Sequence, residues 1–218
     1  MSPRRTPAET RTALLDGAVQ ALRRDGIAGL SARRLADRAG VNQALIFYHF
    51  GGVADLVDAA CRRSAEAAVE TYRARFAQAR TFGDLLQVGR ELHETERGAG
   101  NVALMAQLLA GAQQDPVLAA TARHCLALWT AEIEPVVRRV VAGTAIAGAV
   151  DPAGLARAVS AGFLGLELYE GVDAAGAGQA LDTLERLGVL VEVVDDLGPV
   201  GRRALQSRLR RRSRGRRT

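Results

Sequence analysis

The chain has 218 residues, of which 48% are hydrophobic and 4% aromatic, and its formal net charge is +5. That length allows one sizeable core, while the scarcity of aromatic residues argues against a β-sandwich or barrel. Because alanine, leucine and arginine fill long stretches and are good helix formers, we expect an all-α fold. All 29 basic residues are arginine, which indicates a high-GC bacterial genome.

The charge is divided along the chain. Residues 1–50 hold eight arginines against four acidic residues, residues 51–201 hold twelve against twenty, and residues 202–218 hold nine arginines and no acid. Basic ends suit a polyanion such as DNA, and an acidic middle keeps the rest of the protein away from it. The tail is expected to be disordered, and either adds non-specific DNA affinity or is a solvated terminus without a specific role.

Two cysteines, Cys61 and Cys125, lie far apart in the sequence and form no CxxC pattern. A disulfide framework is therefore not expected, and a reducing compartment is. The N-terminus lacks the apolar core of a signal peptide, and no uncharged run is long enough to span a bilayer. These features predict a soluble, cytoplasmic protein without a membrane partner.

Caps and glycines mark the first helices. A capping box at Thr6 and Glu9, with a proline at the first helical position, predicts a helix over 7–25. Two short helices are expected at about 32–39 and 43–50, separated by a glycine turn and ended by a pair of glycines.

Longer helices fill the rest of the chain. Apolar residues at helical spacing predict a helix over about 53–79, and a cap at Thr81 starts the next one. Pro135 is expected to kink or split the helix that begins at Asp115. In all we expect about nine to ten helices, the others covering about 101–112, 152–171 and 173–196.

Residues 31–50 have the sequence SARRLADRAGVNQALIFYHF, which predicts two short helices joined by a sharp turn. Gly40 permits the positive φ that such a turn needs, and Val41 can fill the gap between the helices. A pair of this kind presents its second helix to the major groove of DNA. Such pairs also occur in helical proteins that bind no DNA, but the basic charge of the N-terminal region favours DNA binding.

The polar residues at the start of the second helix are candidates for base recognition. Residues 42–44 lie at the end that faces base edges, and Gln43 can form two hydrogen bonds with an adenine. Arg33 on the preceding helix can bond guanine, and an aromatic pair later in the second helix suits phosphate contacts. The expected DNA-binding set is Arg33, Asn42, Gln43, Ala44, Tyr48 and His49.

Several short motifs occur together in this region. They are Gly-Ile-x-x-Leu-Ser at 26–31, Leu-Ala at 35–36, Ala-Gly-Val at 39–41 and Phe-Tyr-His-Phe at 47–50. In this combination, residues 10–56 resemble the DNA-binding domain of TetR-family transcriptional regulators. The resemblance implies a three-helix DNA-binding domain, a long fourth helix as linker and a C-terminal helical domain that dimerises. By this resemblance, every residue of the expected set except Asn42 aligns with a DNA-contacting position.

The expected division is a DNA-binding domain at 1–52, a linking helix at 53–79, a ligand-binding and dimerisation domain at 80–200 and the arginine-rich tail at 201–218. The resemblance implies a dimeric regulator of double-stranded DNA with a palindromic operator. We expect a repressor that a small molecule releases by tilting the linking helix. The alternative is a ligand-independent architectural protein that binds DNA through its basic ends.

Two positions depart from the family pattern. Phe47 stands where the family usually has a tyrosine, and Val53 stands where it usually has a lysine. Both substitutions predict a weaker grip on the DNA backbone. Tyr48 is expected to compensate for the tyrosine hydroxyl that is missing at position 47. Arg4, Arg5 or the tail is expected to offset the weaker binding to the DNA backbone.

Beyond about residue 80 the resemblance is architectural, so ligand-contacting and dimer-forming candidates come from residue chemistry. Polar or aromatic residues amid apolar helix faces are the ligand candidates, although each has the simpler interpretation of a structural residue. They are His93, Met105, Gln107, His124 and Trp129. Two apolar stripes on the last helices predict a dimeric four-helix interface, or else face the chain's own core. They are Leu155, Val159, Phe163 and Leu166, and Leu181, Leu184, Leu187 and Val191.

Catalytic and metal-binding patterns are not expected. None of the three histidines pairs with another at helical spacing, and the sequence has no phosphate-binding loop and no GxSxG motif. The sequence therefore predicts a protein that is not an enzyme, with no cofactor and no metal site.

Overall fold

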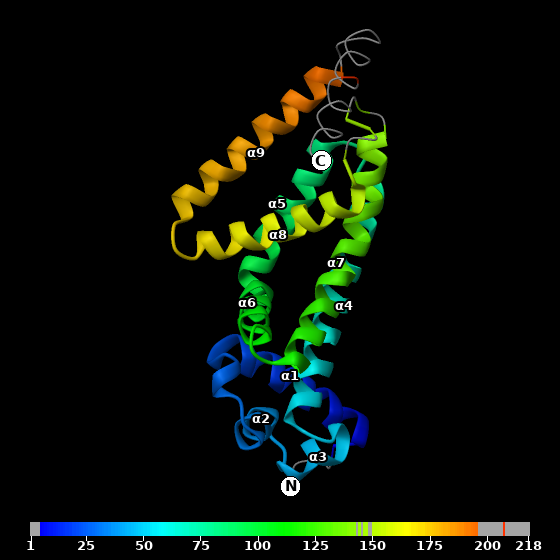
Figure 1. Ribbon diagram of the computed structural model, residues 1–218. Coiled ribbons are helices and arrows are strands. Elements are labelled where there is room, and N and C mark those ends of the chain that lie inside the picture. Colours follow the sequence, from blue (N-terminus) through cyan, green and yellow to red (C-terminus); the bar gives the residue numbers. More distant parts are fainter. Residues whose placement is uncertain (1–4, 143, 145, 148–149, 196–206, 208–218) are drawn as a thin grey trace. The chain divides into compact units, whose positions relative to one another are not determined.

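The computed structural model describes residues 5–142, 144, 146–147, 150–195 and 207, and within these ranges all regular structure is helical (Figure 1). The expected all-α fold is confirmed. The elements are α1 (Pro7–Asp25), the 3₁₀-helix η1 (Ile27–Gly29), α2 (Ala32–Ala39), α3 (Ala44–Phe50), α4 (Val53–Gln78), α5 (Phe82–Ala99), α6 (Asn101–Ala112), α7 (Pro116–Ala142), α8 (Pro152–Glu170) and α9 (Ala174–Asp195).

The chain forms two compact units. The first comprises residues 1–70 and 96–128, and the second comprises residues 71–95 and 129–218. The first unit extends beyond the range 1–52 because α6 packs against α1 and the first half of α7 belongs to the same unit. Helices α4 and α7 each contribute residues to both units.

Side-chain caps fix where the helices begin, as the sequence predicts. At α1 the N–H of Thr6 donates to Glu9 Oε2 at 2.7 Å, and this hydrogen bond lowers the pKa of Glu9. At α5 the N–H of Asp84 donates to Thr81 Oγ1 at 3.0 Å. Asp151 accepts from the N–H of Gly154 at 2.9 Å at the start of α8. Each cap satisfies helix N–H groups that have no partner within the helix.

Two local features differ from expectation. Helix α7 runs unbroken through Pro135, so of the expected kink or split, the split does not occur. The residues after the proline, Val136 and Val137, are completely buried, and this packing holds the helix together despite the hydrogen bond that proline cannot donate. The turn η1 was not predicted, because only three residues form it.

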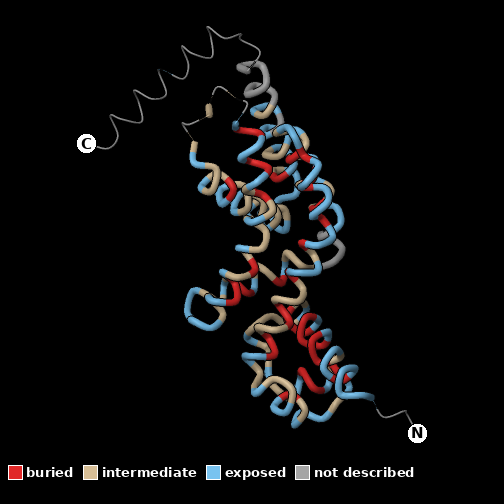
Figure 2. Tube along the Cα trace, turned by 90° about the vertical axis from the view of Figure 1, so that its right-hand side faces the viewer, coloured by how far each residue is buried: buried red, intermediate tan, exposed pale blue. Residues whose placement is uncertain are grey.

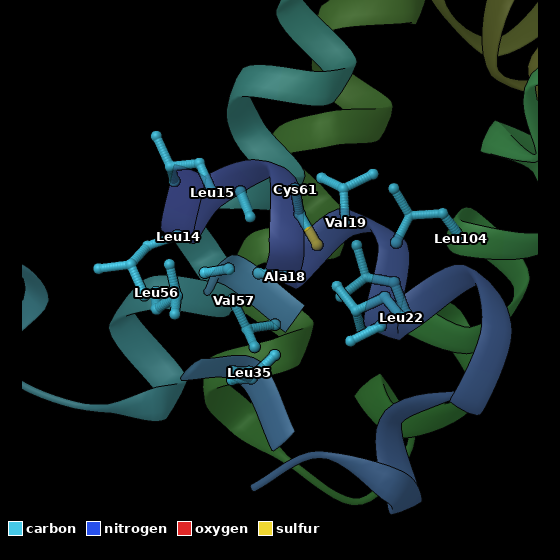
Figure 3. Close-up of a cluster of buried hydrophobic side chains, with 14 of the residues drawn as sticks. Leu14, Leu15, Ala18, Val19, Leu22, Leu35, Leu56, Val57, Cys61 and Leu104 are labelled. Atoms are coloured by element: carbon cyan, nitrogen blue, oxygen red, sulfur yellow. The ribbon is translucent and has the colours of Figure 1, made fainter. Parts of the chain in front are cut away.

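The core of the first unit gathers apolar side chains from several helices (Figure 3). Leu14 and Leu22 of α1 and Leu35 of α2 are fully buried, as are Leu56 of α4 and Leu108 of α6. Figure 2 shows these buried stretches lining the inside of the unit, with exposed positions outside. Burial of each such leucine contributes about 1.5–3 kcal/mol, so this core fixes the short helices α2 and α3.

The core of the second unit contains one face each of α4, α5, α7 and α8. Tyr72 and Phe76 at the end of α4 pack beside Trp129 of α7, with ring centroids 6.3 and 6.5 Å away. Ion pairs lie at its surface, one of them from Arg73 Nε to Glu132 Oε1 at 3.0 Å.

No single helix among the described residues is long and apolar enough to cross a membrane; α3 and α4 meet that test only as a pair bent by 63°. Three expectations concern parts that the structure does not describe. They are the contribution of Arg4 to DNA binding, the disorder of the tail and the place of the Val191 side chain in the dimer interface. Of the tail, the structure describes only Ser207.

Candidate nucleic-acid interface

A tight turn sets the angle between α2 and α3. Gly40 has φ 64° and ψ 41°, the left-handed conformation that glycine adopts without strain. The N–H of Val41 donates to the carbonyl of Ala36 at 3.0 Å, which closes the end of α2 in the manner of a Schellman motif. The side chain of Val41 packs against the core of the first unit, as the sequence predicts.

One face of α3 anchors it. Ile46 is completely buried, and Leu45 and Phe50 pack partly buried against the same core. The guanidinium of Arg11 lies 5.0 Å from the centre of the Phe50 ring, a cation–π contact that ties α3 to α1. The opposite face of this short helix is therefore held outward by packing.

The outward face of α3 carries polar and aromatic side chains. Gln43 and Ala44 are exposed, and Phe47 and Tyr48 expose 55% and 79% of their surface. Gln43 and Phe47 are four residues apart, as are Ala44 and Tyr48, so the four share one face. The prediction for this helix omitted Phe47 as a contact. Its spacing from Gln43 was the signal that could have found it.

Two members of the expected set have additional structural roles. Asn42 Oδ1 accepts a hydrogen bond from the N–H of Ala44 at 2.8 Å and so caps α3, which leaves its amide NH₂ as the group that can reach a phosphate. His49 is half-buried, and its ring stands edge-on to that of Tyr48 with centroids 4.9 Å apart. Both residues lie beside the outward face.

The arginines around this face fall into two groups. Arg33 exposes 86% of its side chain and lies only 4.0 Å from Asp37 across one helical turn. Arg38 instead pairs with Asp25 at 2.8 Å, and Arg34 donates to the carbonyl of Gly29 at 3.0 Å. Arg5 donates to the carbonyl of Ala39 at 2.7 Å, so the N-terminal arm helps to hold the end of α2. Arg33 is therefore highly exposed, whereas Arg38, Arg34 and Arg5 each bond to other parts of the fold.

The start of α4 is acidic. Gly51, with φ 86°, ends α3, and Val53 begins α4 with part of its side chain against the core. Asp55 is exposed in the first turn of α4. A carboxylate stabilises the helix at this position and would repel a nearby phosphate.

The five ligand candidates fall into both units. Met105, Gln107 and His124 lie in the first unit; Met105 packs against its core, and His124 Nε2 is 4.0 Å from Glu66 Oε1. His93 and Trp129 lie in the second unit. The group next to Trp129 that the sequence prediction missed is the buried hydroxyl of Tyr72, which has no hydrogen-bond partner among the described residues.

The residues predicted to form the dimer interface fall into a group that packs against the core and a group that is more exposed. Leu155, Val159 and Phe163 pack against the core of the second unit, which is the alternative role the sequence allows. Leu184 and Leu187 of α9 are exposed, while Leu166 and Leu181 are half-buried.

The other face of α8 points outward. A Cβ placed on Gly162 or Gly165 would meet no atom within 4 Å, and the exposed Tyr169 continues the same helical spacing. Val172, also exposed, lies in the turn just after the helix. We refer to Gly162, Gly165 and Tyr169, with Val172 in the turn that follows, as the outer face of α8.

The family model for bacterial regulatory proteins of the tetR family matches residues 14–60, and no curated protein sequence matches the chain. A solved structure from Rhodococcus sp., assigned to the TetR family, is 25% identical, with 84% of this chain and 98% of the other covered and a TM-score of 0.70. A TetR-family member from Streptomyces coelicolor A3 is 27% identical over 82% of this chain and 97% of its own, with a TM-score of 0.60.

The multidrug binding protein EbrR, solved with imidazole, is 27% identical over 85% of this chain and 96% of its own, with a TM-score of 0.60. EbrR has also been solved with proflavin. The family match covers α2, α3 and most of α1, which are the helices that build the outward face described above. Residues 14–60 therefore match the DNA-binding domain of the TetR family, and the chain as a whole is similar to solved structures of TetR-family transcriptional regulators.

Proposed function

We propose that the protein is a cytoplasmic, dimeric repressor that binds a palindromic operator through α3 and leaves it when a small molecule binds. The observation that carries the proposal is the outward face of α3, which presents Gln43, Ala44, Phe47 and Tyr48 away from the core. A helix held in this way fits the major groove with its first residues at base edges.

The side chains on this face suit different parts of DNA. Gln43 is placed to form two hydrogen bonds with an adenine, and Arg33 to do so with a guanine. Phe47 offers an apolar surface to a thymine methyl group. The hydroxyl of Tyr48, with Asn42 and His49 beside it, suits phosphate contacts that position the helix without reading sequence.

Dimerisation would use α8 and α9. The outer face of α8 combines glycines, which let a second helix approach closely, with exposed apolar side chains. Leu184 and Leu187 add apolar surface from α9. Two such helices from each copy form a four-helix interface under two-fold symmetry, and that symmetry matches a palindromic operator.

The effector would bind in the second unit, beside Tyr72 and Trp129. A buried hydroxyl without a partner costs about 1–3 kcal/mol, so a ligand that bonds the Tyr72 hydroxyl gains binding energy there. The flat nitrogen heterocycles imidazole and proflavin, bound by EbrR, suggest a compound that stacks on Trp129. Because Tyr72 and Phe76 belong to α4, the ligand would act on the same helix that follows α3 in the chain.

The test uses DNA that the wild-type protein selects from a random pool. It measures how tightly two matched variants bind that DNA. Gln43→Ala removes a base contact and should weaken binding by about 1–3 kcal/mol, with lost preference at the base pair it reads. Gln20→Ala changes an exposed glutamine of α1 and should leave binding unchanged. Equal affinity of both variants would contradict recognition through α3. Wild-type binding without sequence preference would favour the architectural alternative.

A further inference from the structure

A histidine and two glutamates meet between α5 and α8 in the second unit. His93 Nδ1 lies 2.5 Å from Glu167 Oε1, and His93 Nε2 lies 3.2 Å from Glu170 Oε2. The side chains are largely buried, with 18% of His93, 5% of Glu167 and 17% of Glu170 exposed. No local sequence pattern predicts this group, because His93 lies 74 residues before Glu167 along the chain.

The geometry suits a single metal ion. Glu167 and Glu170 are three residues apart and therefore share one face of α8, opposite His93 on α5. One ligand atom from each residue lies within 4.8 Å of the other two. Ligands of a tetrahedral zinc ion are about 3.4 Å apart, since each lies about 2.0–2.2 Å from the metal, so small side-chain movements bring the three atoms into place.

The chemistry of the ligands narrows the choice of ion. One imidazole nitrogen with two carboxylate oxygens suits zinc, cobalt or manganese, whereas calcium and magnesium prefer sites made of oxygen alone. The two carboxylates are anionic ligands, which suit the positive charge of a divalent ion.

We propose that His93, Glu167 and Glu170 bind one divalent transition-metal ion, with zinc as the representative. Three protein ligands leave a fourth position for water or for a donor atom of another ligand. The ion joins α5 to α8 within the second unit. This proposal concerns metal binding alone and does not depend on the proposed DNA-binding function.

The test is a zinc titration of the full-length protein in competition with a chromogenic chelator. We expect one zinc ion per chain, and at least a tenfold loss of affinity in His93→Ala and in Glu167→Gln. The matched controls are His124→Ala in the first unit and Glu94→Gln, an exposed glutamate beside His93 on α5, and both should bind as the wild type does. Magnesium in excess should not displace the zinc.

A measurement on the wild-type protein keeps the test valid if a variant fails to fold. The chain has three histidines, so nitrogen NMR of histidine-labelled protein resolves each imidazole. Zinc should shift the ring nitrogens of His93 and leave those of His49 and His124 in place. The proposal is overturned if the wild type takes up no zinc, if His93→Ala binds zinc like the wild type, or if another histidine is the one that shifts.

Discussion

Val53 begins α4, and the exposed Asp55 adds a negative charge in the same turn. A lysine at position 53 would add a cation there, and its aliphatic stem can cover the surface on which Val53 packs. Val53→Lys should therefore tighten DNA binding and steepen its dependence on the logarithm of salt concentration by about 0.9.

Val53→Gln is the control for this substitution, because glutamine is long but uncharged. It should leave the salt dependence as in the wild type. If Val53→Lys bound DNA with the wild-type salt slope, the start of α4 would not face the phosphate backbone.

The hydroxyl of Tyr72 is buried without a described partner, so its removal should not harm the fold. Tyr72→Phe should keep or raise the free energy of unfolding, by up to about 1 kcal/mol, while weakening the binding of an effector such as proflavin. The only tryptophan, Trp129, lies beside Tyr72 and reports binding through its fluorescence.

Tyr48→Phe provides the comparison, since Tyr48 is highly exposed and lies in the first unit, whereas Trp129 lies in the second. It should change neither stability nor the fluorescence titration of the effector. A marked loss of stability in Tyr72→Phe would show that its hydroxyl has a partner within the folded protein, and would contradict the proposed effector site.

Both cysteines are buried, and burial raises the pKa of Cys61 to about 12 and that of Cys125 to about 11. In the unfolded chain thiols ionise near pH 8.5, so above that pH the folded state retains protons that the unfolded state loses. Stability should therefore fall as pH rises from about 8.5 towards 12, by at most about 1.4 kcal/mol per pH unit for each thiol.

Urea unfolding of the wild type and of a Cys61→Ala/Cys125→Ala variant between pH 8 and 11 measures this effect. The variant is expected to be less stable throughout because of the cavities it creates, but to decline less steeply with pH. Parallel curves for the two proteins would contradict the raised thiol pKa values.

At the scale of single helices, the sequence predicted the fold well because its signals are local. Thr6, Thr81 and Asp151 each begin a helix through a hydrogen bond within a few residues, and such patterns are visible in the sequence. The break expected at Pro135 does not occur, because packing of the residues after it outweighs the local penalty. Tertiary contacts decide such cases, and the sequence pattern does not show them.

The candidate sites likewise divide into those that a local sequence pattern predicts and those that depend on contacts between distant helices. The outward face of α3 follows from helical spacing and a family resemblance, and Phe47 shares that face although it was not in the expected DNA-binding set. The stripe containing Phe163 has the right period but packs against the chain's own core, because period alone does not say which of two apolar partners a helix meets. The cluster around His93 needs contacts between distant helices, so no local pattern reveals it.

The outer face of α8 offers a test that separates dimerisation from folding. Gly165→Arg has room for its side chain in the single chain and gains helix propensity, so the protein should fold, but it should be monomeric and bind DNA poorly. Gly89→Arg on α5 also meets no atom within 4 Å and should remain dimeric. Light scattering after size-exclusion chromatography measures the oligomeric state of both variants. A dimeric Gly165→Arg protein would argue against this interface.

Across the whole molecule, the distribution of charge agrees with the proposed division into a DNA-binding region and a body that does not contact DNA. The basic N-terminal region contains the helices that would face DNA, and residues 51–201 are acidic, which disfavours non-specific contacts between the body and the DNA backbone. Helix α4 contributes residues to both compact units, so the proposed effector site beside Tyr72 lies on the same continuous helix that begins at Val53.

Selection of bound DNA from a random pool by the full-length protein tests the central claim most directly. A dimer that reads the major groove through α3 predicts a two-fold symmetric consensus, with half-sites centred about one helical turn, roughly 34 Å, or a multiple of it apart. Bound DNA without any consensus, with affinity that falls steeply as salt rises, would contradict sequence-specific recognition by this protein.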